Sequence, residues 1–142
     1  MTVRQISVFL ENRQGRLALL SETLASRGID MLAISVADTT DYGILRIIVS
    51  DCELAEQVLR EAGYSVNITD VIAVAVDDSP GGLAGILRLL SDQGLSVGYL
   101  YSLVHRIGHN AVLLLQLRDL SRAVQILQDQ GVRLLSEQEI QA

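Results

Sequence analysis

The sequence is an imperfect tandem repeat, and this duplication limits the possible folds more than any other feature. The halves match at a shift of 66 residues up to Gly28 and at a shift of 68 residues from Asp51 onward. A repeat of this kind indicates one supersecondary unit copied in tandem. The matched pairs are Glu11 and Asp77, Gly15 and Gly81, Leu17 and Leu83, Leu20 and Ile86, Leu24 and Leu90, Gly28 and Gly94, Asp51 and Asp119, Ala55 and Ala123, Val58 and Ile126, Leu59 and Leu127, and Gly63 and Gly131. We expect two domains, residues 1–69 and 70–142, with their boundary near 69–71.

In each half, the spacing of the apolar residues along the sequence is typical, in turn, of a strand, a helix, two strands, a helix and a strand. This order predicts an α+β fold of two ferredoxin-like βαββαβ repeats, each an antiparallel sheet with both helices on one face. The expected strands are 4–10, 29–37, 42–49, 64–69, 71–76, 95–104, 110–117 and 132–135, and the expected helices are 16–27, one after Glu53, 80–93 and 119–130.

Local signals indicate where the helices begin and end. A glycine follows each of the four helices, as is typical of left-handed C-caps. Ser50 and Glu53 suggest a capping box, and Ser79-Pro80 suggests an N-cap followed by the first helical residue. The tail after Ser136 is expected to be frayed.

Two strands are apolar on both faces, namely 71–76 and 111–115. A domain of about 60–70 residues also has a marginal core and usually needs a neighbour or partner subunit. We therefore expect the apolar faces to be covered by the other repeat or by another copy, and we predict a homo-oligomer, most simply a dimer.

Composition excludes several classes of function. The net charge is −6 and there is no basic stripe, which argues against nucleic acid and anionic membranes as partners. The longest apolar run, 71–76, is far shorter than the roughly 18–20 residues of a membrane span, and no export signal is recognisable at the start. The single cysteine, Cys52, rules out an internal disulfide, so we expect a cytoplasmic protein. His105 and His109 flank a turn without a third ligand, and no metal or cofactor is predicted.

Similar glycine-containing loops join the first strand of each half to its first helix. They are E-N-R-Q-G-R-L at 11–17 and D-D-S-P-G-G at 77–82. Free backbone N–H groups at the start of a helix can bind a carboxylate or a phosphate. The alternative is that these glycines only permit a tight turn.

The pattern of a strand, E-N-R-x-G, an amphipathic helix and then G-I-D-M on a new strand resembles the ACT regulatory domain, twice over nearly the whole chain. The resemblance implies βαββαβ modules that bind amino acids at interfaces between paired domains and regulate enzymes of amino-acid metabolism. The loop is most similar to the serine-sensing type of phosphoglycerate dehydrogenases, with Asn12 and Gly15 at matching positions. Leu10, Gln14 and Asp30 stand where that type has histidine, proline and a second asparagine.

This resemblance implies the ligand contacts. In the first repeat Gly15 and Asn12, with Arg13, would receive the carboxylate and Asp30 the ammonium. In the second repeat Ser79, Gly81 and Gly82 would receive the carboxylate and Asp78 the ammonium. The full set of expected ligand-binding residues is Asn12, Arg13, Gln14, Gly15, Arg16, Leu17, Asp30, Met31, Asp78, Ser79, Gly81, Gly82, Leu83 and Ser96.

We expect a non-catalytic protein that senses a small amino acid and acts through its oligomeric state or on a regulated enzyme in trans. Two alternatives remain. One is an acylphosphatase-like enzyme with phosphate on the arginine-bearing loop, although Arg13 and Arg16 become Ser79 and Gly82 in the second half. The other is a structural subunit with vestigial ligand loops.

Overall fold

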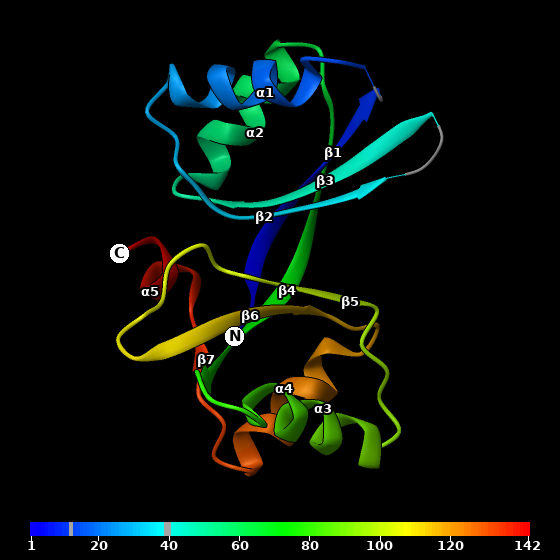
Figure 1. Ribbon diagram of the computed structural model, residues 1–142, viewed down its shortest axis with the longest axis vertical. Helices are drawn as coiled ribbons and strands as arrows, with labels where there is room; N and C mark the ends of the chain where they lie inside the picture. The colour runs from blue at the N-terminus through cyan, green and yellow to red at the C-terminus, as the bar shows by residue number, and fades with distance from the viewer. Residues whose placement is uncertain (12, 39–40) are drawn as a thin grey trace. The chain divides into compact units, whose positions relative to one another are not determined.

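The computed structural model describes residues 1–11, 13–38 and 41–142. The chain divides into two compact units, made mainly of residues 4–69 and 70–140. Both have the predicted α+β ferredoxin-like architecture, in which two helices cover one face of an antiparallel sheet (Figure 1). In the described part of the chain, no helix is long and apolar enough to cross a membrane.

The first unit follows the order β1 (Val3–Glu11), α1 (Arg16–Ala25), β2 (Met31–Asp38), β3 (Tyr42–Val49), α2 (Cys52–Glu61) and the start of β4 (Ser65–Asp77). The strands are arranged β2-β3-β1-β4, with β3 antiparallel to both of its neighbours. Ile6 lies opposite Ile47, and Leu10 lies opposite Gly43. The edge strand β2 pairs only with β3 in this order, so its outer edge is not hydrogen-bonded within the sheet.

The core of the first unit lies between its sheet and its two helices. Alternate residues of the strands meet the leucine stripe of α1 and the apolar face of α2, as their periods predict. The buried cluster consists of Ile6, Val8, Leu10, Leu20, Leu24, Ile29, Leu45, Ile47, Val49, Cys52, Ala55, Val58, Leu59 and Val66.

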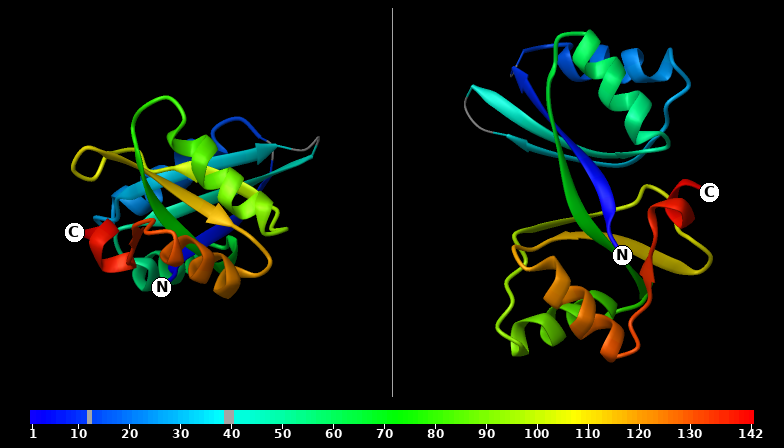
Figure 2. Two further views of the ribbon diagram at one scale, coloured as in Figure 1. Left: turned by 90° about the horizontal axis from the view of Figure 1, so that it is seen from below. Right: turned by 180° about the vertical axis from the view of Figure 1, so that it is seen from behind.

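The second unit repeats this arrangement (Figure 2). It contains the later part of β4, α3 (Gly82–Asp92), β5 (Tyr99–Ser102), β6 (Asn110–Gln116), α4 (Leu120–Asp129), β7 (Leu134–Leu135) and α5 (Glu137–Gln141). Its strands are arranged β7-β4-β6-β5. Ile72, Val74, Leu113 and Leu115 face the helices. Because strand side chains alternate, neighbours such as Leu114 point to the other face, so both faces are apolar as expected.

The second helix of each unit is capped by an aspartate. The carboxylates of Asp51 and Asp119 accept hydrogen bonds from the N–H groups of Leu54 and Arg122, each at 3.1 Å. The predicted capping box was therefore wrong by one residue. The Ser50 hydroxyl instead accepts a hydrogen bond from the Asp30 N–H at 2.9 Å.

The region around residue 70 differs from the prediction. β4 is one continuous strand from Ser65 to Asp77 rather than two strands that meet at 69–71. No glycine or proline interrupts this segment, so nothing forces the backbone out of the extended conformation. β5 and β7 are shorter than expected.

The C-terminal tail is also more ordered than predicted, because it forms the short helix α5. Ser136 and Glu139 cap it reciprocally: the Glu139 N–H donates to the Ser136 hydroxyl and the Ser136 N–H donates to the Glu139 carboxylate. This backbone hydrogen bond, together with the contact to Arg133, lowers the pKa of the Glu139 carboxyl.

Candidate ligand-binding turns

The turn between β1 and α1 is held by two backbone hydrogen bonds. The Arg13 N–H donates to the Glu11 carbonyl at 2.8 Å, and the Arg16 N–H donates to the Arg13 carbonyl at 3.3 Å. Gly15 has φ 84° and ψ −6°. Gln14, at the second position of this four-residue turn, does not have a positive φ, so the angles of Gly15 at the third position define a type II turn, which favours glycine there. Asn12 lies outside the described residues.

The turn between β4 and α3 repeats this geometry. The Ser79 N–H donates to the Asp77 carbonyl at 2.8 Å, and the Gly82 N–H donates to the Ser79 carbonyl at 3.1 Å. Gly81 has φ 90° and ψ −7°, and Pro80 has the fixed φ that suits the second position of a type II turn.

This geometry corrects the predicted helix start. Gly81, not Ser79, is the N-cap, and α3 begins at Gly82 rather than at Pro80. The sequence S-P looked like an N-cap followed by N1, but the same residues open the type II turn that precedes the helix. Gly82 is required for a second reason, since a Cβ added there would lie 2.3 Å from the Asp77 carbonyl oxygen.

The first helix of each unit lacks the side-chain cap that the second helix has. Among the residues that the structure describes, no side chain caps α1 at Gly15 or α3 at Gly81, whereas Asp51 and Asp119 cap α2 and α4. The exposed N–H groups at the starts of α1 and α3 therefore favour an external hydrogen-bond acceptor, in particular an anion.

A hollow of about 530 Å³, here called the first hollow, lies beside the first turn. Three segments form its wall: the end of β1, one flank of α1 and the turn that follows α2. Its lining residues are Phe9, Leu10, Glu11, Arg16, Leu19, Thr23, Ala62, Gly63, Tyr64 and Ser65. This volume lies within the roughly 300–1,000 Å³ typical of small-molecule sites, and the lining is both apolar and polar.

Glu11 joins the two arginines of the first turn. Arg13 Nε lies 3.0 Å, and Arg16 Nη2 lies 3.4 Å, from the same carboxylate oxygen, Oε2. The Arg16 and Glu11 side chains are 38% and 51% exposed, so their ion pair contributes only about 0–1 kcal/mol and is easily exchanged. Of this group, Glu11 and Arg16 line the first hollow.

The second unit has a hollow of about 500 Å³ at the equivalent place, here called the second hollow. Its wall consists of the end of β4, the second turn, the start of β6 and the turn that follows α4. The lining residues are Ala75, Val76, Asp77, Ser79, Pro80, Gly81, Gly82, Ile86, Asn110, Gly131, Val132 and Arg133.

The charges around the second turn are arranged differently. Asp78 forms an ion pair with Arg106 of the β5–β6 hairpin, and neither residue lines the second hollow. Arg133 does line it, but its guanidinium lies 3.2 Å from the Glu139 carboxylate. Among the described lining residues of this hollow, Asp77 is thus the acidic one, and Arg133, the cationic one, is ion-paired.

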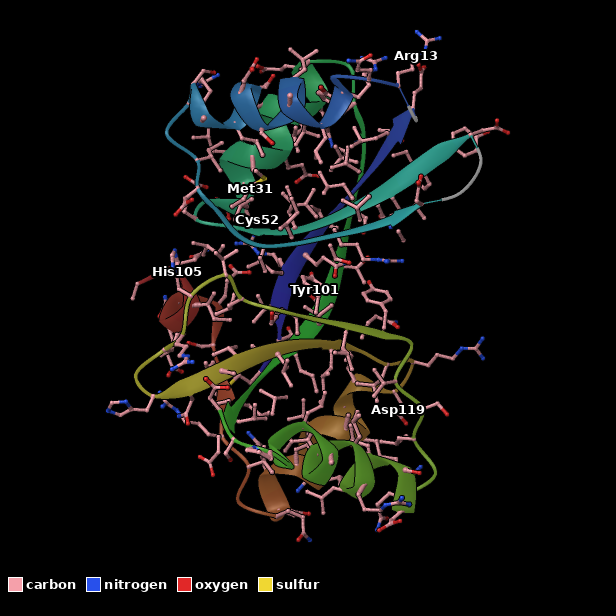
Figure 3. All side chains as sticks on the ribbon, in the orientation of Figure 1. Arg13, Met31, Cys52, Tyr101, His105 and Asp119 are labelled. Carbon is pink, nitrogen blue, oxygen red and sulfur yellow. The ribbon has the colours of Figure 1, made fainter. Side chains whose placement is uncertain are left out.

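Several predicted ligand residues lie away from the turns of their own unit. Asp30 and Met31 follow the far end of α1, which at ten residues is about 15 Å long. Figure 3, in which Arg13 and Met31 are labelled, shows them apart. The Asp30 backbone exchanges hydrogen bonds with Ser50. Ser96 lines a separate hollow of about 570 Å³ with Gly98, Gln116 and Asp119.

The remaining predicted residues stay at the turns. Leu17 and Leu83 are exposed on the first turns of α1 and α3, and Arg13 and Gln14 are exposed. Sequence reasoning missed Glu11, Tyr64, Asn110 and Arg133 as lining residues. The repeated glycines Gly63 and Gly131, which lie in the turns that close the two hollows, were the available signal.

Other candidate sites are not supported by the structure. Among the described residues, no group of three or more His, Cys, Asp or Glu side chains could hold a metal ion. Tyr99 and Tyr101 contact each other, with ring centroids 6.4 Å apart. Cys52 is buried in the first core.

The chain is similar to known proteins over its whole length. A family described as an ACT domain pair matches residues 1–142. A protein from Bacteroides thetaiotaomicron whose crystal structure is known is 35% identical, with a TM-score of 0.92 over 99% of this chain and 96% of that one. A comparison with curated proteins found no match.

Two more distant structures have the same fold. The ligand-free regulatory subunit of aspartate kinase from Thermus thermophilus is 14% identical, with a TM-score of 0.62 over 89% of this chain and 90% of that one. Aspartate kinase from Synechocystis is 22% identical, with a TM-score of 0.57 over 96% of this chain and 28% of that one.

The close approach at Gly82 generates a stability prediction. Gly82→Ala should lower the free energy of unfolding by about 1–3 kcal/mol, because its Cβ would collide with a backbone carbonyl. Gly85→Ala, one turn away in the same helix and with no atom near its added Cβ, should raise it by about 0.5–1 kcal/mol. Urea unfolding measures both, and a Gly82→Ala variant as stable as Gly85→Ala would contradict the turn geometry.

Proposed function

Because the chain belongs to the family of ACT domain pairs, we propose that it is a regulatory protein that binds a small amino acid at the turn before α1. It acts through its oligomeric state or on a partner enzyme in trans. Catalysis is not part of this proposal.

The contrast between helix starts carries the proposal. In each unit, the second helix is capped by its own aspartate, whereas the first helix follows a left-handed glycine and has no side-chain cap from any described residue. The same unit therefore contains one helix whose first N–H groups are bonded to an aspartate side chain and one whose first N–H groups are not. A ligand carboxylate is a suitable acceptor for the latter.

The chemistry of an amino acid fits the surroundings of the first turn. Its carboxylate can accept hydrogen bonds from the first-turn N–H groups and from Asn12, and Arg13 and Arg16 supply positive charge nearby. The loop resembles the serine-sensing type, so serine is one ligand to test. A phosphate cradle of the acylphosphatase kind is a weaker alternative, because Ser79 and Gly82 replace Arg13 and Arg16 in the second turn.

The ligand's ammonium needs an acceptor, and Asp30 is the residue that the family resemblance suggests. Within one copy it follows the opposite end of α1 from Gly15, so one small molecule does not span both. A second copy can supply it. We therefore propose that the site is completed across a dimer.

The edge of β2 is the surface that fits this dimer. Asp38, at the end of β2, lies opposite Gly43, and Gly43 also lies opposite Leu10 near the end of β1. The end of β2 is therefore at the same end of the sheet as the first turn. Antiparallel pairing of two β2 edges about a twofold axis would bring Asp30 of the second copy to that end.

Exposed apolar residues along this edge support the same pairing. Ile34 and Val36 lie opposite the helix-facing Ile47 and Leu45, yet they are 38% and 50% exposed. Leu17, on α1, is also exposed. An edge strand of this kind, without lysine or proline, is suited to pair with another strand.

Ligand binding at such an interface would be coupled to dimer formation. A ligand that contacts two copies favours the paired state, and coupling of this kind is typically about 1–3 kcal/mol. That is enough to change the fraction of dimer, or the surface presented to a regulated enzyme, by roughly 5- to 150-fold.

The function is tested by thermal stability in the presence of each common L-α-amino acid. At 100 times its dissociation constant a ligand stabilises a one-site protein by about 2.7 kcal/mol, which should raise the melting temperature by roughly 5–11 °C. Asn12→Ala should reduce this shift with little effect on the free protein, and the exposed-strand control Asn67→Ala should not. If no amino acid gives a shift, the vestigial-loop alternative is favoured.

The dimer is tested by light scattering. The wild type should have about twice the chain mass of 15.4 kDa at micromolar concentration. Ile34→Lys with Val36→Lys should give a monomer, because lysines on an edge strand oppose pairing. Val104→Lys, at an exposed valine of the second unit, should remain a dimer. A wild-type monomer, or a dimer unaffected by the β2 lysines, would rule out this interface.

A further inference from the structure

We propose that each chain binds one amino-acid ligand, at the first turn, where Arg16 leaves Glu11 to bind the ligand's carboxylate, and that the second turn binds none. This inference rests on the proposed function and specifies which of the two repeated sites is active.

The two hollows share their backbone but differ in charge. The first turn carries Glu11, Arg13 and Arg16, a net charge of +1. The second turn carries Asp77 and Asp78, and with the ion-paired Arg106 its net charge is −1. A carboxylate approaching the first hollow is therefore attracted, and one approaching the second is repelled.

Arg16 is the residue that can change partners in the first hollow. It lines the hollow together with Glu11, and their ion pair is long at 3.4 Å and partly exposed. Arg13 lies closer to the same Glu11 oxygen, at 3.0 Å. When Arg16 turns to the ligand, Glu11 stays paired with Arg13. The two positive charges of the arginines are then balanced by the negative charges of Glu11 and the ligand carboxylate.

The second hollow cannot acquire the same group. The position equivalent to Arg16 is Gly82, where even a Cβ would lie 2.3 Å from the Asp77 carbonyl oxygen. Its one described cationic lining residue, Arg133, comes from the turn after α4 and pairs with Glu139 at 3.2 Å, and Asp78 pairs with Arg106 outside the hollow. The second turn thus keeps the shape of the first, but none of its own residues, 77–82, is cationic.

The rest of the first hollow indicates the kind of side chain that the ligand has. Leu19 and Tyr64 offer apolar surface, while Thr23 and Ser65 add hydroxyl groups. Apart from Glu11 and Arg16, no described lining residue is charged. The hollow therefore suits a neutral amino acid rather than a lysine or a glutamate.

Isothermal titration calorimetry of the full chain with each common L-α-amino acid tests the proposal. We expect one molecule bound per chain and a neutral side chain on the best ligand. Arg16→Gln should raise the dissociation constant by at least about tenfold, the loss expected for one charge-assisted hydrogen bond. Arg106→Gln, which removes the arginine paired to the second turn, should leave it within about twofold.

Two further measurements separate direct contact from a merely structural role. Glu11→Gln should not weaken binding, because Glu11 competes with the ligand for Arg16. Converting the best ligand to its carboxamide should weaken binding to the wild type by about tenfold but should hardly affect binding to Arg16→Gln.

The outcomes distinguish this inference from the function on which it rests. Two ligands per chain, or loss of binding in Arg106→Gln but not in Arg16→Gln, would overturn the inference and leave the proposed function standing. An equal effect of the carboxamide on wild type and Arg16→Gln would also overturn it. No binding of any amino acid would overturn both.

Discussion

The left-handed glycine of each strand-to-helix turn is the constraint on which the rest of both units depends. Gly15 and Gly81 have φ near 90°, a conformation in which other L-residues are strained. The turn lets the chain leave the first strand and start a helix that returns over the sheet within four residues. The leucine stripe of each helix is thereby aligned with the alternating residues of the strands, and the two cores follow.

The same turn also determines what the start of the helix can do. A glycine at the N-cap has no side chain with which to accept from the first helical N–H groups, whereas the aspartates before α2 and α4 do accept. Within the described part of the chain, the first helix of each unit therefore starts without a side-chain cap. Charge then distinguishes the two: arginines surround the first, and the aspartates Asp77 and Asp78 surround the second.

Much of this organisation is predictable from sequence, because it is local and repeated. The apolar stripes of the helices and the glycines that follow them predict structure within one half, and the 66-residue shift predicts that the other half repeats it. The errors occur where two local interpretations compete. Ser79-Pro80 is consistent with a helix start or with a type II turn, and only the positive φ of Gly81 decides. The strands expected at 64–69 and 71–76 are one continuous strand, because no glycine or proline separates them.

The candidate site was less predictable, since it depends on segments that are distant in sequence. Glu11 was identified as part of the loop, but its pairing with Arg13 and Arg16 is a matter of side-chain geometry. The walls formed by the turns after α2 and α4 arise only when the units fold. Asp30 was matched to the family's second asparagine, yet in one copy it follows the opposite end of α1 from Gly15, which makes a second copy part of the proposal.

The most direct test of the central claim, that an amino acid binds at the first turn, is a titration followed by the backbone amide signals in nuclear magnetic resonance. The account predicts that the best ligand shifts the signals of Gly15, Arg16 and Leu17, while those of the equivalent Gly81, Gly82 and Leu83 stay in place. Shifts confined to the second turn, or to the hollow around Ser96 and Asp119, would contradict it.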